Sequence, residues 1–285
     1  MSRRMPPSVR LHLYLSPHFD DAILSCGGLI HAQRQAGERV GVLTLCTASN
    51  ANVSLPLARS YESEWREASA VSRREENLAA LSAWGVIGWE GGAPDAIHRS
   101  GIEGPYYPAR ENLFGEPDAR DAAAVLSIWE TGLNGIAEEQ GHTILLYAPL
   151  GVGGHVDHEL ARRLAERFRG DVRFYEDYPY AELAPGGVTE ALAHFGPHTW
   201  TSETVAIDVH AKIAAIQKYR SQIGRVFGCD KDLIRRVCEF TAGTACALST
   251  RERVRQRLAP SGLRLLLWRR MLGYHRHAER TWRRT

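Results

Sequence analysis

The sequence predicts an α/β fold: a Rossmann-like, mostly parallel β-sheet with helices on both faces, followed by C-terminal additions. Two observations point to this fold class. Over about the first 175 residues, short apolar runs alternate with longer segments whose apolar residues recur at helical spacing. The runs are also nearly continuously apolar, as expected of strands that are buried on both faces of a parallel sheet. Successive strands of this kind are joined by right-handed crossovers.

The first part of the pattern contains three strands and two helices. In chain order these are a strand at Leu11–Leu15, a helix at Ser25–Gln35, a strand at Val40–Leu45, a helix at Ser60–Trp84 and a strand at Val86–Trp89. Pro17 ends the first strand, and Gly37 supplies the left-handed cap expected just past the first helix. The second helix is predicted from apolar residues spaced about 3.6 residues apart, with charges on the opposite side.

A long loop is predicted at residues 90–118, which hold five glycines and four prolines. That composition continues neither a helix nor a strand, and loops of this length are often functional. The later predicted elements are a helix at Asp118–Glu139, a strand at Thr143–Tyr147, a helix from about Val156, a strand at Val172–Tyr175, a helix near residues 188–195, a strand at Trp200–Ile207, a helix at His210–Tyr219 and a final basic helical stretch.

The chain shows neither an internal repeat nor a composition break that would mark a linker. All 285 residues are therefore predicted to form a single domain, with a core at about 10–180 and a helical, basic extension at about 210–285. With 44% hydrophobic and 24% charged residues, the composition excludes disordered, collagen-like and coiled-coil proteins. The chain is long enough to bury a substantial core.

Membrane and secretory segments are not predicted. The longest apolar runs, such as Leu265–Trp268, fall far below the roughly 18 to 20 residues of a membrane-spanning helix. The N-terminus lacks the apolar region of a secretory signal, so we expect a cytoplasmic protein. The five cysteines form no CxxC pair, which argues against a disulfide framework or a thiolate zinc site and predicts reduced core residues.

Charge is distributed unevenly along the chain. Residues 251–285 carry eleven arginines against two glutamates, a net +9, whereas the formal charge of the whole chain is +2. The remainder is therefore acidic. The basic tail could contact nucleic acid, an anionic membrane or the acidic body, and we expect the last, as a solvated helix on its own domain. No nucleic-acid partner is expected, and homo-oligomer formation is left open.

Two clusters of potential metal ligands follow strands of the predicted sheet. Ser16–Asp21 follows the first strand, and Gly153–His158 follows the strand at Thr143–Tyr147. Because ligands of such sheets bind at the carboxyl ends of the strands, both clusters are expected at one edge. Imidazole and carboxylate groups bind zinc when thiolates are absent, and three protein ligands leave a position open for catalysis.

His18, Asp21 and His158 would supply two nitrogens and one oxygen to such a metal. Asp20 and His155 would then remain beside it as the acid and base that hydrolysis requires, and the Asp157 carboxylate could hold the His155 ring in one tautomer. The structural alternative is that aspartates at a helix start merely cap free N–H groups. Adjacent carboxylates repel each other and are costly to bury without a cation, which favours the metal site.

The two clusters resemble the signature of a known family. His18-Phe19-Asp20-Asp21 is similar to the His-Pro-Asp-Asp motif of the PIG-L/LmbE-like zinc-dependent N-acetylglucosaminyl deacetylases, and His155-Val156-Asp157-His158 is similar to their His-x-Asp-His element. Arg73–Leu81 and Tyr147–Pro149 extend the resemblance, which covers about residues 10–180. Phe19 replaces the usual proline, and Ala22 replaces the usual acidic residue.

The resemblance implies a metal-dependent hydrolase that removes the N-acetyl group from an N-acetylglucosamine-type amino sugar or glycoconjugate. It implies the following roles: Zn²⁺ or another divalent transition metal bound by His18, Asp21 and His158, Asp20 as the general base, His155 as the group that stabilises the oxyanion or protonates the amine, Asp157 as its orienting partner, and Arg73 and Tyr178 near the substrate. Four kinds of substrate fit this reaction: free N-acetylglucosamine, a thiol-cofactor precursor, a lipid-linked sugar and an antibiotic glycoside.

Three alternatives are kept beside this interpretation. The ligands alone would also suit another metal-dependent amide or ester hydrolase. A non-catalytic metal-containing binding protein would not need Asp20 or His155. A nucleotide-binding Rossmann enzyme is disfavoured because the glycines of Gly151–Val156 lack the spacing of the dinucleotide fingerprint.

Overall fold

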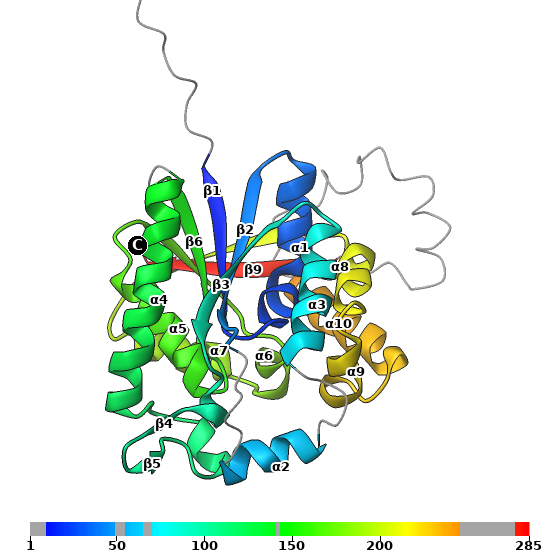
Figure 1. Ribbon diagram of the computed structural model, residues 1–285. Helices are drawn as coiled ribbons and strands as arrows, with labels where there is room; N and C mark the ends of the chain where they lie inside the picture. The colour runs from blue at the N-terminus through cyan, green and yellow to red at the C-terminus, as the bar shows by residue number, and fades with distance from the viewer. Residues whose placement is uncertain (1–9, 49–54, 65–69, 141–142, 246–276, 285) are drawn as a thin grey trace, which may run out of the picture.

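A seven-stranded β-sheet forms the centre of the molecule (Figure 1). The computed structural model describes residues 10–48, 55–64, 70–140, 143–245 and 277–284. In spatial order the strands are β3 (Ile87–Ala93), β2 (Arg39–Cys46), β1 (Leu11–Ser16), β6 (Ile144–Pro149), β7 (Asp171–Tyr175), β9 (Ala278–Arg284) and β8 (Trp200–Ala206). From β3 to β7 all neighbours are parallel, whereas β9 is antiparallel to both of its neighbours. The predicted fold class is confirmed.

Helices cover both faces of this sheet (Figure 1). On one face lie α1 (Asp21–Gln35), α3 (Ala70–Ser82), α8 (Val209–Ile216), α9 (Arg220–Val226) and α10 (Asp230–Ala245). The opposite face is covered by α4 (Ala119–Glu139), α5 (Val156–Arg167) and α7 (Gly187–His194), and the short α6 (Tyr180–Leu183) follows β7. Among the described residues, no helix is both long enough and apolar enough to cross a bilayer.

Each strand supplies side chains to two separate cores. In β1, Leu13 and Leu15 pack towards α4 and α5, whereas the intervening Tyr14 packs towards α1. All three side chains are fully buried, because alternate residues of a strand face opposite sides of a sheet. Trp129 of α4 fills the first core and donates its indole N–H to the carbonyl of Leu45 at 3.1 Å. The continuous apolar runs are therefore strands buried on both faces of the sheet, as predicted.

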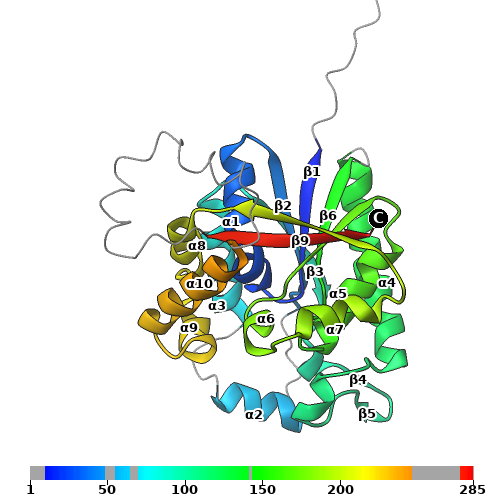
Figure 2. The ribbon, with the colours of Figure 1, turned by 180° about the vertical axis from the view of Figure 1, so that it is seen from behind.

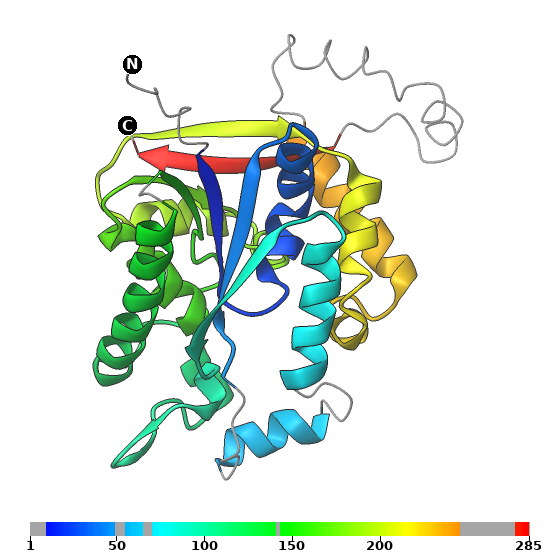
Figure 3. The same ribbon diagram turned by 45° about the horizontal axis from the view of Figure 1, so that its top comes forward.

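The predicted helix at Ser60–Trp84 is wrong as a single element. The structure has two helices here, α2 (Pro56–Glu64) and α3, and they run in different directions (Figure 3). Whereas α3 packs on the sheet through Leu81, α2 lies beyond the carboxyl ends of the strands, where Leu57 and Tyr61 join a small third core. Helical periodicity is local, so it cannot show that a helix stops packing on one surface and starts on another.

The predicted loop at 90–118 contains more regular structure than its composition suggests. Strand β3 continues to Ala93, and short elements follow: the 3-10 helices η1 (Ala96–His98) and η2 (Arg110–Leu113) and the hairpin strands β4 (Ser100–Gly101) and β5 (Gly104–Pro105). Glycine is required within β3 itself, because a Cβ on Gly91 would lie 2.8 Å from the Leu45 Cα. The register between β2 and β3 shifts here, so the glycines mark an irregular strand instead of its end.

The predicted basic helix at the C-terminus is wrong for its last residues, and residues 246–276 lie outside the described part of the chain. Residues 278–284 form β9, which lies between β7 and β8 (Figures 2 and 3). Arg280 donates to Glu176 at 2.5 Å and Arg284 donates to Glu166 at 2.5 Å. This part of the tail therefore contacts the acidic body, as expected, but as a strand of the sheet.

A buried ion pair also anchors β9 to the helical layer. Glu279 is 2.5 Å from the Lys212 ammonium of α8, and both side chains are almost fully buried. The same carboxylate accepts backbone N–H groups of Gly28 and Leu29 in α1. A buried pair of this kind is tolerated because nearly all its hydrogen-bonding groups are satisfied. These contacts join segments about 250 residues apart, which no local pattern in the sequence reveals.

Candidate metal centre

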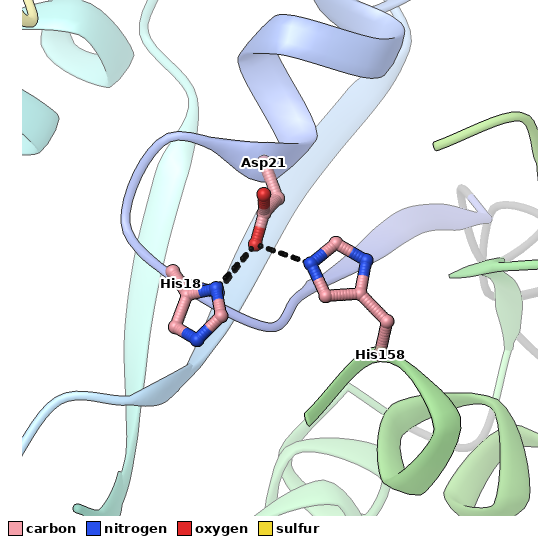
Figure 4. A group of neighbouring side chains, drawn as sticks. All are labelled: His18, Asp21 and His158. Carbon is pink, nitrogen blue, oxygen red and sulfur yellow. Dashed lines mark hydrogen bonds and ion pairs between the residues drawn. The ribbon is translucent and has the colours of Figure 1, made fainter. Parts of the chain in front are cut away.

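The two predicted ligand clusters meet at the carboxyl ends of β1 and β6. The ligand atoms of His18, Asp21 and His158 all lie within 4.8 Å of one another. Asp21 Oδ2 lies between the two rings, 3.1 Å from His18 Nδ1 and 3.3 Å from His158 Nε2 (Figure 4). The sequence places these segments more than 130 residues apart, and the parallel sheet brings them to one edge.

Local hydrogen bonds fix the turn that carries the first ligands. The Ser16 hydroxyl donates to the His18 carbonyl at 2.6 Å and accepts the N–H of Ala22 at 3.0 Å. Asp21 Oδ2 accepts the backbone N–H of His18 at 2.7 Å. The start of α1 is therefore held closely against the end of β1, so that the ring and the carboxylate face the same point.

The His158 ring is held from its other side by a carboxylate. Its Nδ1 lies 2.6 Å from Asp177 Oδ1, and the second oxygen of Asp177 accepts the backbone N–H groups of Gly151 and Val152 at 3.0 Å. Asp177 is fully buried. A carboxylate in this place fixes the tautomer that leaves His158 Nε2 available as a ligand.

The donor set fits a divalent cation. Within the described residues, the buried Nε2 of His158 forms no hydrogen bond, although a carboxylate oxygen lies beside it. Burial alone would lower the pKa of His158, but Asp21 and Asp177 raise it to about 10. For His18, burial is likewise outweighed by Asp95, Asp157 and Asp21, which raise its pKa well above the ordinary value. The excess of negative charge around both rings is what a bound metal ion would neutralise.

Asp20 has the properties of a spare carboxylate. It occupies the N-cap position of α1 yet forms no capping hydrogen bond, so the simple structural role considered for it is not observed. The side chain is buried, and Arg73 Nη2 lies 3.5 Å from its Oδ1. Burial raises the pKa of Asp20 despite the opposing charge of Arg73, which brings its proton affinity closer to that of a general base. Arg73 thus lies next to Asp20, and its contact with the substrate stays a prediction.

His155 is held by a backbone group and not by the Asp157 carboxylate. It is the N-cap residue of α5, and its Nδ1 accepts the backbone N–H of Asp157 at 3.2 Å. A neutral ring in this arrangement carries its proton on Nε2. Burial lowers the pKa of His155 to about 4, so the ring is neutral near pH 7. The predicted role of the Asp157 side chain towards His155 is therefore corrected.

The Asp157 carboxylate instead orients His18. Its Oδ2 is 3.1 Å from His18 Nε2, and its Oδ1 accepts a hydrogen bond from Arg99 Nη1 at 2.5 Å. Burial raises the pKa of Asp157, but Arg99 and His18 outweigh burial and lower it far below the ordinary value. Arg99 is itself buried and pairs with Asp121 of α4 at 2.9 Å. This ionic network connects the candidate site to the 90–118 segment.

Residues 13–168 match the family described as PIG-L: GlcNAc-PI de-N-acetylase, which is more than half of the chain. The chain belongs to the PIG-L deacetylase family. Both ligand clusters of this PIG-L protein lie within the matched range, as do strands β2, β3 and β6 and most of β1.

Curated relatives of this PIG-L protein include two enzymes named 2′-N-acetylparomamine deacetylase. The one from Niallia circulans is 28% identical over 239 residues, covering 77% of this chain and 83% of that protein. The one from Streptomyces fradiae is 30% identical over 173 residues, covering 59% of this chain and 57% of that protein.

Solved structures show the same fold. The zinc-inhibited form of teicoplanin deacetylase Orf2 aligns with a TM-score of 0.74 and 23% identity, covering 96% of this chain and 98% of that one. The A40926 pseudoaglycone deacetylase Dbv21 aligns with a TM-score of 0.68 and 23% identity, covering 98% of each chain.

Three residues of the site, Asp177, Asp95 and Arg99, were not predicted from the sequence of this PIG-L protein. Asp177 and Asp95 lie two residues beyond the ends of strands β7 and β3, so the strand-end argument used for the histidines would have found them. Arg99 gave no signal, because it lies in the segment predicted as irregular loop. Tyr180 packs its ring edge against His158, with ring centroids 5.4 Å apart, and it covers Gly153. A Cβ on Gly153 would lie 2.6 Å from the Tyr180 ring, so this glycine admits the tyrosine.

Tyr178, which the resemblance placed near the substrate, lies in the core of the PIG-L protein. Its side chain is 1% exposed and packs against Phe227 and Phe240. The backbone N–H of Tyr178 donates to the Ser25 hydroxyl of α1 at 3.1 Å. Tyr178 and Tyr180, on either side of Pro179, thus lie in different environments: Tyr178 lies in the core, and Tyr180 lies beside the metal centre.

We expect Asp177→Asn to weaken metal binding by about 10- to 100-fold while the protein stays folded. The amide keeps the shape of the side chain but loses the charge that holds the His158 ring. It also has only one acceptor oxygen, so it cannot both accept from His158 and accept the backbone N–H groups of Gly151 and Val152. Isothermal titration of the metal-free variant with Zn²⁺ measures this change. The exposed Asp171→Asn at the start of β7 is the matched control, and equal affinities in the two variants would contradict the orienting role.

Proposed function

We propose that this protein is a metal-dependent N-deacetylase that hydrolyses the acetamide of an N-acetylated amino sugar. One observation carries the proposal: three ligands converge beside the buried Asp20, whose carboxylate forms no capping hydrogen bond and lies 3.5 Å from Arg73. The proposed substrate is a small glycoconjugate, and the proposed location is the cytoplasm. Because two relatives are 2′-N-acetylparomamine deacetylases, an aminoglycoside precursor of that kind is the first substrate to test.

His18, Asp21 and His158 would hold the cation, which is Zn²⁺ in this proposal because two imidazoles and a carboxylate suit it. When bound, the cation supplies Lewis-acid polarisation of the acetyl carbonyl and lowers the pKa of water. These three side chains are fixed by Ser16, Asp157 and Asp177, so little reorganisation is needed on binding. Another divalent transition metal would occupy the same donors.

Asp20 would remove a proton from the attacking water. The hydroxyl group adds to the acetyl carbon, and Asp20 then returns the proton to the amine nitrogen as the C–N bond breaks. Acetate and a free amine leave. The raised pKa of Asp20 favours this exchange, because a general base works best when its pKa lies near the operating pH.

His155 would stabilise the negative charge that develops on the acetyl oxygen. The backbone N–H of Asp157 occupies Nδ1, so the neutral ring presents its Nε2–H as a donor. A single preorganised donor of this type contributes about 3 kcal/mol to transition-state stabilisation. Arg73, beside Asp20, would contact the sugar or its aglycone.

The purified protein is expected to release acetate and a primary amine from 2′-N-acetylparomamine. A panel containing this compound, N-acetylglucosamine and a lipid-linked N-acetylglucosamine, with amine release followed by fluorescent labelling, would measure the substrate preference. Chelation should abolish the release, and added Zn²⁺ should restore it. If no N-acetylated glycoside in the panel yields amine from metal-loaded protein, the proposal is wrong.

A further inference from the structure

The two nitrogens of the His18 ring face different sets of donors. Nδ1 faces Asp21 Oδ2 in the candidate metal centre, at 3.1 Å. Nε2 faces away from that centre, towards Asp157 Oδ2 at 3.1 Å and Asp95 Oδ2 at 3.5 Å. The His18 ring therefore lies between two sets of potential ligand atoms, and the proposed function uses only the set that faces Nδ1.

A cysteine completes the second set. The donor atoms of His18, Cys46 and Asp157 all lie within 4.8 Å of one another. Cys46 ends β2 and is a free, buried thiol, and its backbone N–H donates to the Pro17 carbonyl at 2.9 Å, next to His18. Asp157 is fully buried. Backbone hydrogen bonds at Cys46 and His18 and the Arg99 side chain at Asp157 thus hold the three donors in place.

We propose that His18 Nε2, Cys46 Sγ and Asp157 Oδ2 form a second, inhibitory cation site that takes thiophilic divalent ions. A thiolate selects soft and borderline metals such as Zn²⁺, Co²⁺ and Cd²⁺ over Mg²⁺ or Ca²⁺. The inhibition rests on the proposed function, because it acts through His18, a ligand of that same metal centre. The binding of an ion to the second site does not depend on the proposed function.

The second site carries an excess of negative charge. The Cys46 thiolate and the carboxylates of Asp157 and Asp95 carry three negative charges, whereas the one positive charge of the Arg99 guanidinium, 2.5 Å from Asp157, is shared with Asp121. A divalent ion would reduce this excess. Binding releases the thiol proton to solvent and involves no transfer of electrons.

Inhibition follows from the chemistry of imidazole. A neutral ring has one nitrogen with a free lone pair, and the other nitrogen carries the proton. If Nε2 of His18 binds the second ion, the proton lies on Nδ1 and faces Asp21. The first centre then loses one of its three ligands. The two sites are therefore mutually exclusive at His18, and excess metal should reduce activity.

Titration of the metal-free protein with Co²⁺ tests the site directly, because a cobalt–thiolate bond gives a near-ultraviolet charge-transfer band. The first equivalent should bind without this band, and the band should appear as further Co²⁺ is added. Deacetylase activity should fall in parallel. Cys46→Ala and Cys46→Ser should keep the activity at one equivalent, lose the band and need at least about tenfold more metal for inhibition. Cys26→Ala, which alters an equally buried thiol of α1, should behave as the wild type.

The outcomes separate this proposal from the proposed function. A thiolate band that depends on Cys46, in a protein that deacetylates no substrate, supports the second site and contradicts the proposed function. Absence of the band in the wild type at excess Co²⁺, or its persistence in both Cys46 variants, overturns the second site whatever the activity. A band complete at one equivalent also overturns it, because the thiolate set would then be the first site to fill.

Discussion

Asp20→Asn is expected to lower kcat by about 10²- to 10⁴-fold, the usual contribution of a general base, without loss of bound metal. The amide has nearly the same size and keeps an acceptor oxygen, but it cannot take a proton from water. Steady-state kinetics on the best substrate of the panel, together with metal analysis by mass spectrometry, would measure both quantities.

Asp118→Asn is the matched control for this variant. Asp118 is also the residue before a helix, but its side chain accepts the backbone N–H of Arg120 and so has a capping role. We expect a normal kcat in that variant. A kcat for Asp20→Asn within a few-fold of the wild type would contradict the assignment of the base.

His158→Ala is expected to abolish both metal binding and turnover. Its ring lies between Asp21 and Asp177, and no other described side chain supplies its nitrogen. The loss should exceed that of Asp177→Asn, which changes only the charge behind the ring. Metal content after dialysis against micromolar zinc would show the difference.

His194→Ala, at an exposed position of α7, is the control for a general effect of removing a histidine. It should retain stoichiometric metal and full activity. If His158→Ala retains metal with unchanged affinity, the centre proposed for this chain has a different ligand set.

Much of the fold and of the metal centre could be predicted because both depend on local patterns combined with one topological rule. The strands are continuous apolar runs such as that of β1, and parallel strands bring their carboxyl ends together. That rule predicts that His18 and His158 lie close together, although the sequence alone gives no distance between them. Applied to every strand, it would also have found Asp95 and Asp177.

The parts that could not be predicted depend on contacts between distant segments. Strand β9 has few apolar residues, and its place in the sheet is specified by pairing with two strands and by polar contacts such as Glu279 with Lys212. The Asp157 carboxylate contacts His18 and not His155 because of the direction in which α5 starts. The spacing of the His-x-Asp-His element does not reveal that direction. Likewise, no periodicity distinguishes Tyr178 in the core from Tyr180 at the site.

The position of β9 has a consequence for the order of folding during synthesis. Its two neighbours, β7 and β8, both leave the ribosome before it does, and among the described strands β8 pairs with β9 only. Until residues 278–284 emerge, β7 presents an open edge to other nascent chains, and exposed edges of this kind promote aggregation. We therefore expect ribosome-bound chains that end before residue 278 to depend on chaperones, although the segments carrying His18, Asp21 and His158 have already been made.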